Sequence, residues 1–171
     1  MAASLTAEDR EQIRDVLARY AWALDTGDVE GFAACFTADG VLVWDAFEEP
    51  AEWCGTEALR GFASFLAGLP TTAGRQHHIG NLVIEGDAGE ARVKAYVTVM
   101  VRQPEGAAHP VTVMGWYDDV LRPTAQGWRI ARHVIRDWSG PVLARLAGQT
   151  GEREARPMPP VLADMPGRIG R

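Results

Sequence analysis

Four segments in the second half of the chain decide its fold: Gln76–Glu85 (QHHIGNLVIE), Glu90–Gln103 (EARVKAYVTVMVRQ), Val111–Arg122 (VTVMGWYDDVLR) and Trp128–Trp138 (WRIARHVIRDW). They are rich in valine, isoleucine, threonine, tyrosine and tryptophan, the residue types that β-strands favour. Short connections with glycine or proline join them, so neighbouring strands should pair antiparallel as a meander. Strands of this length normally bend, and we therefore expect a curved sheet with one face covered.

Three helices are predicted in the first half of the chain. The first, over about Ala7–Asp25, follows a capping box formed by Thr6 and Asp9, and its apolar residues recur at three- and four-residue spacing. Asp28 and Thr56 are suitable N-cap residues for a second and a third helix. Because the helices precede the meander, the sequence indicates a segregated α+β fold.

The helices should pack on the concave face of the curved antiparallel (mixed) sheet and leave a cone with one open mouth. Between the second and third helices, a strand is expected over Val41–Asp45, whereas Glu48–Cys54 is expected to be irregular. At 171 residues the chain has room for one domain with an internal cavity. We assign residues 1–140 to this domain and residues 141–171 to a helical turn and a tail rich in proline, glycine and arginine. Residues after about Thr150 are expected to be dispensable or to depend on a partner.

Composition argues against several classes of function. The net charge of -6 repels a polyanion, so nucleic-acid binding is not expected. The polar start of the chain lacks the basic patch and apolar run of a secretory signal, and no stretch is long enough to span a membrane, which predicts a cytoplasmic protein. Cys35 and Cys54 are isolated, and no nucleotide-binding motif is present, so we expect neither a metal nor a cofactor.

Three polar residues are candidates for chemistry. Tyr20 and Asp25 can face the same interior from the first helix, although each also has an ordinary interpretation, as a core aromatic and as the start of a turn. A carboxylate at a helix C-terminus meets an unfavourable dipole, and a cationic or imidazole partner would explain its presence. His77 and His78 begin a strand, so strand alternation allows only one of them to face the cone, which argues against a metal site.

The order of several short motifs resembles the SnoaL-like branch of the NTF2-like superfamily, from about Leu5 to Trp138. The segments that carry the resemblance are Arg19–Asp28 (RYAWALDTGD), Phe36–Gly40 (FTADG), Arg75–Asn81 (RQHHIGN), Gly115–Asp119 (GWYDD) and Gly127–Ile130 (GWRI).

The resemblance implies a cone-shaped fold, commonly dimeric through the outer face of the sheet, and a small-molecule ligand. Members of this family include dehydratases, isomerases, polyketide cyclases, dioxygenase small subunits and proteins without known activity. In the dehydratase-like members an Asp at the end of the first helix pairs with a His at the start of the long strand, and a Tyr assists. The matching positions are Tyr20, Asp25 and His77, with the choice between His77 and His78 left open by the doubled histidine.

The expected function is that of a cofactor-independent lyase or isomerase, dehydratase-like, acting on a small hydrophobic carbonyl compound. His77 would remove a proton next to the carbonyl, Asp25 would orient the imidazole, and Tyr20 would donate a hydrogen bond. A SnoaL-type polyketide cyclase, or a noncatalytic ligand-binding or dioxygenase small-subunit-like domain, is the alternative. The protein is expected to be a homodimer. Candidate substrate-binding residues are Trp44, Trp53, Phe62, His78, Asn81, Trp116 and Trp138.

Overall fold

The computed structural model describes residues 3–103, 105, 107–137, 157–163 and 165–169. Its strands form one sheet in the order β3-β4-β5-β6-β1-β2-β7. Strands β3 to β6 pair antiparallel in sequence order, so the predicted meander is confirmed. The strands are β1 (Phe36–Asp45), β2 (Ala51–Cys54), β3 (Arg75–Asp87), β4 (Glu90–Val101), β5 (Val111–Thr124), β6 (Gly127–Asp137) and β7 (Arg168–Ile169).

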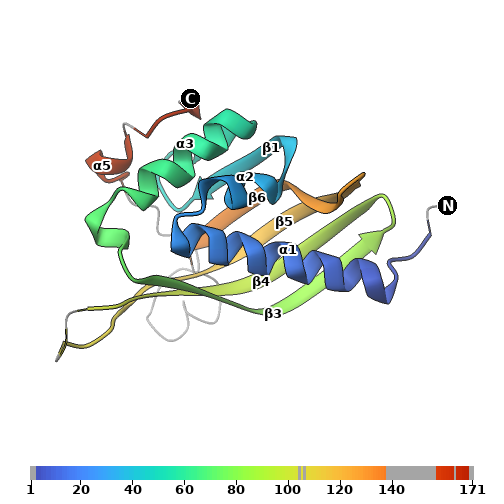
Figure 1. Ribbon diagram of the computed structural model, residues 1–171, viewed down its shortest axis with the longest axis horizontal. Coiled ribbons are helices and arrows are strands. Elements are labelled where there is room, and N and C mark those ends of the chain that lie inside the picture. Colours follow the sequence, from blue (N-terminus) through green and yellow to red (C-terminus); the bar gives the residue numbers. More distant parts are fainter. Residues whose placement is uncertain (1–2, 104, 106, 138–156, 164, 170–171) are drawn as a thin grey trace.

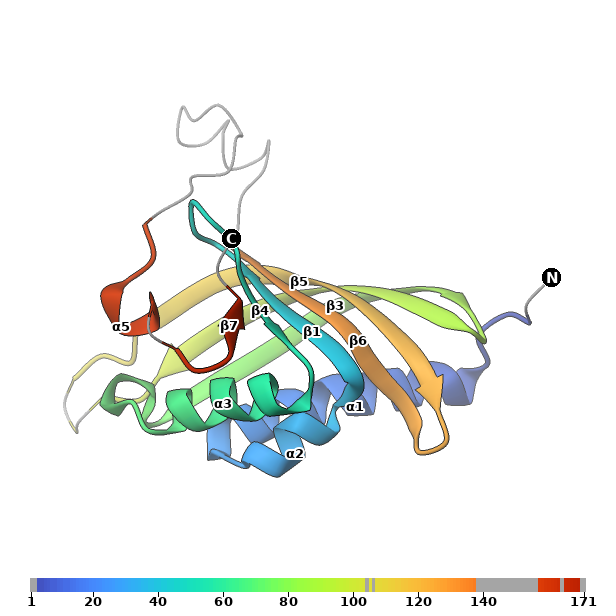
Figure 2. The same cartoon turned by 90° about the horizontal axis from the view of Figure 1, so that it is seen from above.

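Three helices lie along one side of the curved sheet (Figures 1 and 2), which confirms the predicted α+β fold. These helices are α1 (Ala7–Thr26), α2 (Val29–Ala34) and α3 (Thr56–Ala67); a 3-10 turn, η1 (Pro70–Thr72), and a short helix near the C-terminus, α5 (Pro160–Ala163), follow them in the chain. The core fills the space between helices and sheet with aliphatic and aromatic side chains, and the large rings of Tyr20, Trp53, Phe62 and Tyr117 are fully buried in it.

Helix α1 has both of the ends that the sequence predicts. The backbone N–H of Asp9 donates to the Thr6 side chain at 3.1 Å, and the Thr6 backbone N–H donates back to the Asp9 carboxylate at 2.8 Å. The indole N–H of Trp128 also donates to Asp9 at 2.9 Å, which fastens this helix end to β6. At the other end, Gly27 adopts a left-handed conformation with φ 74°, so α1 stops directly after Asp25 and Thr26.

The region between α2 and α3 differs from the prediction. Strand β1 begins at Phe36 rather than Val41, with an irregular register between these two residues, and it runs parallel to β6. The segment Ala51–Cys54, expected to be irregular, forms β2 beside β1. Strand β1 pairs with β6 along one edge and with β2 along the other. The sheet is therefore mixed, as expected for this fold class.

The described end of the C-terminal segment packs on the domain. We call the described residues 158–163 and 165–169 the C-terminal strap. In it Leu162 and Met165 are buried, and β7 pairs with β2. The strap passes close to α3, because a side chain placed at Gly167 would lie 2.8 Å from the Cα of Ala58. Without the strap, the apolar surface that Leu162 and Met165 cover would be exposed to water. That residues after about Thr150 are dispensable or depend on a partner stays a prediction.

Candidate functional site

A cavity of about 380 Å³ lies between the concave face of the sheet, α1, α3 and the C-terminal strap. Its walls are mainly aliphatic and aromatic. Polar groups are contributed by a few residues, among them Tyr20, Thr72, Arg75, His77 and Tyr117. An apolar cavity with a few convergent polar groups is the usual form of a small-molecule site.

Asp25 and His77 form a closely bonded pair at the edge of this cavity. The Asp25 carboxylate accepts the backbone N–H of His77 at 2.7 Å through Oδ2, and its Oδ1 lies 2.5 Å from Nδ1 of the His77 ring. The two side chains are largely buried, with 15% and 9% of their surface exposed. The carboxylate thus holds both the backbone and the ring of His77, which fixes the position of the imidazole relative to α1.

The pair leaves one nitrogen of His77 available to a ligand. An ionised Asp25 selects the tautomer in which Nδ1–H donates to the carboxylate, so Nε2 carries the free lone pair. His77 lines the cavity, whereas Asp25 lines a more open hollow beside α1, which His77 also lines. Asp25 is therefore placed to orient His77 and to stabilise its protonated form rather than to touch a ligand in the cavity.

A third charged residue, Arg75, joins this pair. Its Nη2 donates to the carbonyl oxygen of Leu24 at 2.8 Å, and its Nε lies 3.5 Å from Oδ1 of Asp25. Burial lowers the pKa of Arg75, while the negative charge of Asp25 opposes this change. Arg75 and His77 together supply the positive and imidazole partners that an acidic residue at a helix C-terminus requires.

Tyr20 reaches the cavity from the middle of α1. Its hydroxyl is buried beside that of Tyr117, with which it interacts, and it makes no other hydrogen bond within the described part of the chain. Burial raises the pKa of Tyr20 far above its usual value, so the group stays protonated and can only act as a neutral donor or acceptor. The ring of Tyr117, another wall residue, lies 6.0 Å from that of Tyr20 in an edge-to-face arrangement.

A second Asp–His pair contacts the rings of Tyr20 and Tyr117. Asp119 and His133 are opposite each other on β5 and β6, and the Nδ1 of His133 lies 2.8 Å from Oδ1 of Asp119. Both side chains are fully buried, and the His133 ring packs against Tyr20 and Tyr117 with centroids 4.5 and 4.3 Å apart. Burial raises the pKa of Asp119, while His133 opposes the shift. The pair does not line the cavity, so its evident role is to hold the tyrosine rings.

The predicted substrate-binding residues divide into three groups. Trp44 and Phe62 line the cavity. Trp53, His78, Asn81 and Trp116 do not, and Trp138 lies outside the described residues.

The structure explains why these four residues do not line the cavity. Trp53 is wholly buried behind Phe62, with ring centroids 4.8 Å apart. His78 is exposed because strand alternation turns it away from the side of His77. Asn81 is exposed at a bulge where β3 gains one residue relative to β4, and its φ of 52° breaks the alternation. Trp116 lies on the outer face of the sheet, with the cations of Lys94 and Arg136 over its ring.

Sequence reasoning missed two parts of the site. Arg75 could have been found, because it precedes His77 by two residues and strand alternation places both on one face. The wall contributed by Pro159, Val161 and Leu162 had no local signal, since nothing in a proline-rich segment tells where it packs.

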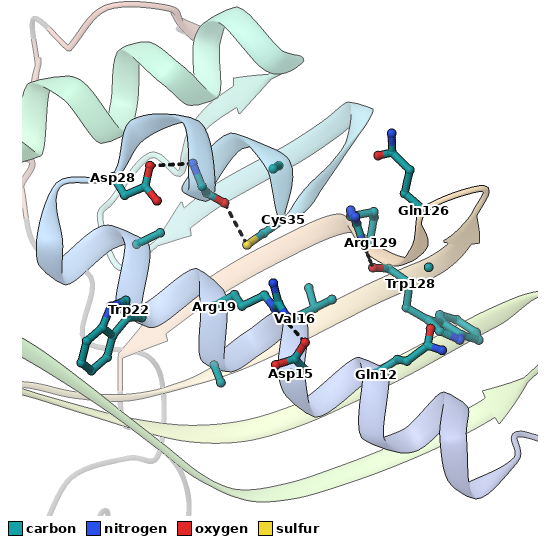
Figure 3. Close-up of a pocket in the computed structure, with 15 residues that line it drawn as sticks. Gln12, Asp15, Val16, Arg19, Trp22, Asp28, Cys35, Gln126, Trp128 and Arg129 are labelled. Atoms are coloured by element: carbon teal, nitrogen blue, oxygen red, sulfur yellow. Dashed lines mark hydrogen bonds and ion pairs between the residues drawn. The ribbon is translucent and has the colours of Figure 1, made fainter.

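A larger surface hollow of about 770 Å³ lies between α1, α2 and the β5–β6 turn (Figure 3). Its charged groups are already satisfied or exposed: Arg19 pairs with Asp15 of the same helix at 2.7 Å. The thiol of Cys35 donates to the carbonyl of Gly31 at 3.2 Å, and burial raises its pKa to about 11, so it is a poor nucleophile. This hollow has larger volume than the cavity but less of the chemistry that a site needs.

No helix in the described ranges is long and apolar enough to cross a membrane.

Comparison with known proteins identifies the family and the fold of this chain. Residues 5–134 match the profile of the SnoaL-like domain. A protein of unknown function with a cystatin-like fold from Nostoc punctiforme is 29% identical, with 79% of this chain and 95% of that chain covered and a TM-score of 0.68. An NTF2-like protein with a cystatin-like fold from Novosphingobium aromaticivorans is 24% identical, with 81% and 88% covered and a TM-score of 0.67.

A proposed scytalone dehydratase from the same bacterium is 22% identical, with 75% of this chain and 83% of that chain covered and a TM-score of 0.64. At the identities of these two Novosphingobium proteins the likeness shows the fold alone. No curated protein sequence matches this chain significantly.

Proposed function

The chain belongs to the SnoaL-like family of the NTF2-like superfamily, and from this premise we propose that it removes a proton from the carbon next to a carbonyl group of a small hydrophobic compound. The observation that carries the proposal is the Asp25–His77 pair, which leaves one imidazole nitrogen free at the edge of an apolar cavity. A reaction of this kind needs a base matched to neutral pH and a site that excludes water, and no cofactor.

The proposed step uses three side chains. Nε2 of His77 takes the proton, the C–H bond breaks, and its electron pair moves into the carbonyl, which becomes an enolate. Asp25 stabilises the imidazolium that forms, because its carboxylate already accepts the Nδ1–H. The buried, protonated hydroxyl of Tyr20 donates a hydrogen bond to the enolate oxygen or to a departing hydroxyl.

The enolate can then lose a leaving group, be protonated elsewhere or attack a second carbonyl. Elimination by a lyase is the outcome we favour, because the buried hydroxyl of Tyr20 can donate a hydrogen bond to a departing hydroxyl group. A SnoaL-type cyclisation would use the same first step and the same residues. The shape of the ligand, rather than the three side chains, selects among these outcomes.

The test follows the first step alone. The protein is incubated in D₂O with enolisable aromatic ketones and oxo acids, and deuterium incorporation next to the carbonyl is measured by NMR. His77→Gln should slow the protein-dependent exchange about 100-fold or more, because it removes the base. Tyr20→Phe should slow it by about 100-fold at most, because it deletes one hydrogen bond and keeps the base.

His78→Gln is the matched control, since His78 is the adjacent residue, exposed and turned to the other face of the strand. It should leave exchange unchanged. Exchange that survives His77→Gln, or that is lost equally in His78→Gln, would remove the proposed base. Absence of exchange with every probe that binds would favour a noncatalytic ligand-binding protein.

A further inference from the structure

Arg75 is unusual among the residues that line the cavity. Of the described wall residues it is the one with a permanent positive charge, and only 9% of its side chain is exposed. A guanidinium with so little access to water loses much of its hydration, and a protein keeps such a group where another partner compensates for that loss. The partners of Arg75 therefore determine whether it has a role beyond packing.

The contacts of Arg75 use a small part of the hydrogen-bonding capacity of its guanidinium group. A guanidinium has five N–H donors, and within the described residues one hydrogen bond is found, from Nη2 to the carbonyl oxygen of Leu24. Nε is buried and forms an ion pair with Asp25, but its distance of 3.5 Å from Oδ1 is long for a hydrogen bond. The guanidinium can thus accommodate a further acceptor that approaches from the cavity.

Asp25 does not fully neutralise this charge, because its carboxylate is already engaged. Both of its oxygens accept hydrogen bonds from His77, at 2.7 and 2.5 Å, which are shorter than the distance to Arg75. One carboxylate is therefore shared between a guanidinium and an imidazole.

The rest of the wall restricts what that ligand can be. Around Arg75 the cavity is lined by aliphatic side chains of β4 and by rings and aliphatic groups of the helices and the strap. The wall residues nearest in sheet register are Val101, opposite Arg75, and Val99, opposite His77. A ligand that fits would have an apolar body and a single anionic group at the Arg75 end.

We propose that Arg75 is the anion-binding residue of the cavity, and that the natural substrate is an apolar carbonyl compound carrying a carboxylate or a comparable anionic oxygen. This inference rests on the proposed function in that it takes the cavity as the substrate site. It adds a specificity determinant that neither Asp25 nor His77 supplies. Two parallel N–H donors from an arginine to a carboxylate are also the strongest form of such recognition.

The alternative role for Arg75 is structural: it would cap the C-terminus of α1 through the Leu24 carbonyl and do nothing else. The two roles predict different results for ligands that differ only in charge. If the role is structural, replacing Arg75 should change the affinity for charged and neutral ligands alike. If Arg75 binds an anion, the replacement should weaken the affinity for the charged ligand alone.

The experiment compares 2-naphthoate with 2-naphthamide, which share an apolar body and differ in the anionic group. Binding is measured by calorimetry on the full chain, without turnover, so the result does not depend on whether the protein is an enzyme. Wild-type protein should bind 2-naphthoate more tightly than 2-naphthamide. Arg75→Gln should weaken 2-naphthoate binding about tenfold or more and leave 2-naphthamide binding unchanged, since it removes a hydrogen bond to a charged group.

Arg75→Lys should retain part of the preference, because it keeps the charge and loses the planar pair of donors. Arg92→Gln is the matched control; Arg92 lies on β4 with its side chain 75% exposed and does not line the cavity. Equal affinity of the wild type for the two probes, or equal loss of both in Arg75→Gln, would overturn the proposal. A preference for 2-naphthoate without any proton exchange would support Arg75 and defeat the proposed reaction.

Discussion

Replacing Asp25 by Asn tests how strongly the Asp25–His77 pair holds the first helix to the sheet. The carboxylate accepts two hydrogen bonds from His77, and asparagine can accept only one of them, while its NH₂ group faces the other donor. Hydrogen bonds to a charged group contribute about 1.5–3 kcal/mol each, and neutral ones about 1 kcal/mol. Relief of the unfavourable helix dipole returns about 0.3–1 kcal/mol.

The net expectation is that Asp25→Asn lowers the free energy of unfolding by about 2–3 kcal/mol. In a urea titration this corresponds to a midpoint lower by about 1 M, for a slope of about 2–3 kcal/mol/M. The slope itself should not change, because the native fold is retained. Removal of the carboxylate also leaves the buried Arg75 without its acidic neighbour, which adds to the loss.

Asp15→Asn provides the matched control on the same helix. Asp15 pairs with Arg19 at 2.7 Å, a distance similar to those of Asp25, but the two side chains are 55% and 72% exposed. Exposed pairs four residues apart on a helix contribute about 0.3–0.5 kcal/mol. If the two variants lose the same stability, burial does not strengthen the Asp25–His77 pair and the reasoning from this geometry fails.

Three further predictions concern the strap, the thiols and the outer face of the sheet. A chain that ends at residue 156 should lose about 3 kcal/mol of stability and most of its affinity for 2-naphthamide, because Leu162 no longer covers the cavity; an unchanged urea midpoint would refute this. At pH 8 iodoacetamide should modify the exposed Cys54 and leave Cys35 unmodified, because burial raises the pKa of the Cys35 thiol to about 11 and keeps it protonated. Labelling of Cys35, detected by mass spectrometry after tryptic digestion, would contradict this. We propose a homodimer through the outer face of the sheet, where Tyr96 and Met114 are large and exposed. Met114→Glu should give a monomer by light scattering, and a monomeric wild type would contradict the proposal.

Local sequence predicts the main helices and the long strands of this protein, although not β2 or the start of β1. The box formed by Thr6 and Asp9, together with Gly27, sets the two ends of α1, because helix caps depend on neighbouring residues alone. The four β-rich segments and their short connections likewise determined the meander, since a short loop leaves an adjacent antiparallel partner as the simplest arrangement. The pairing of Asp25 with His77 came from family resemblance, which carries tertiary information that local pattern lacks.

Tertiary structure alone decided the details of the site. The parallel pairing of β1 with β6 joins segments far apart in sequence, and the bulge in β3 that displaces Asn81 depends on the register of β3 with β4. The opposition of Asp119 to His133 follows from the register of β5 on β6. Such contacts join residues far apart in sequence, so their energies appear only after the elements have packed, and local propensity does not encode them. The strap wall of the cavity is the clearest case, because its proline-rich sequence has no periodicity and its apolar residues acquire a function only against α3 and the sheet.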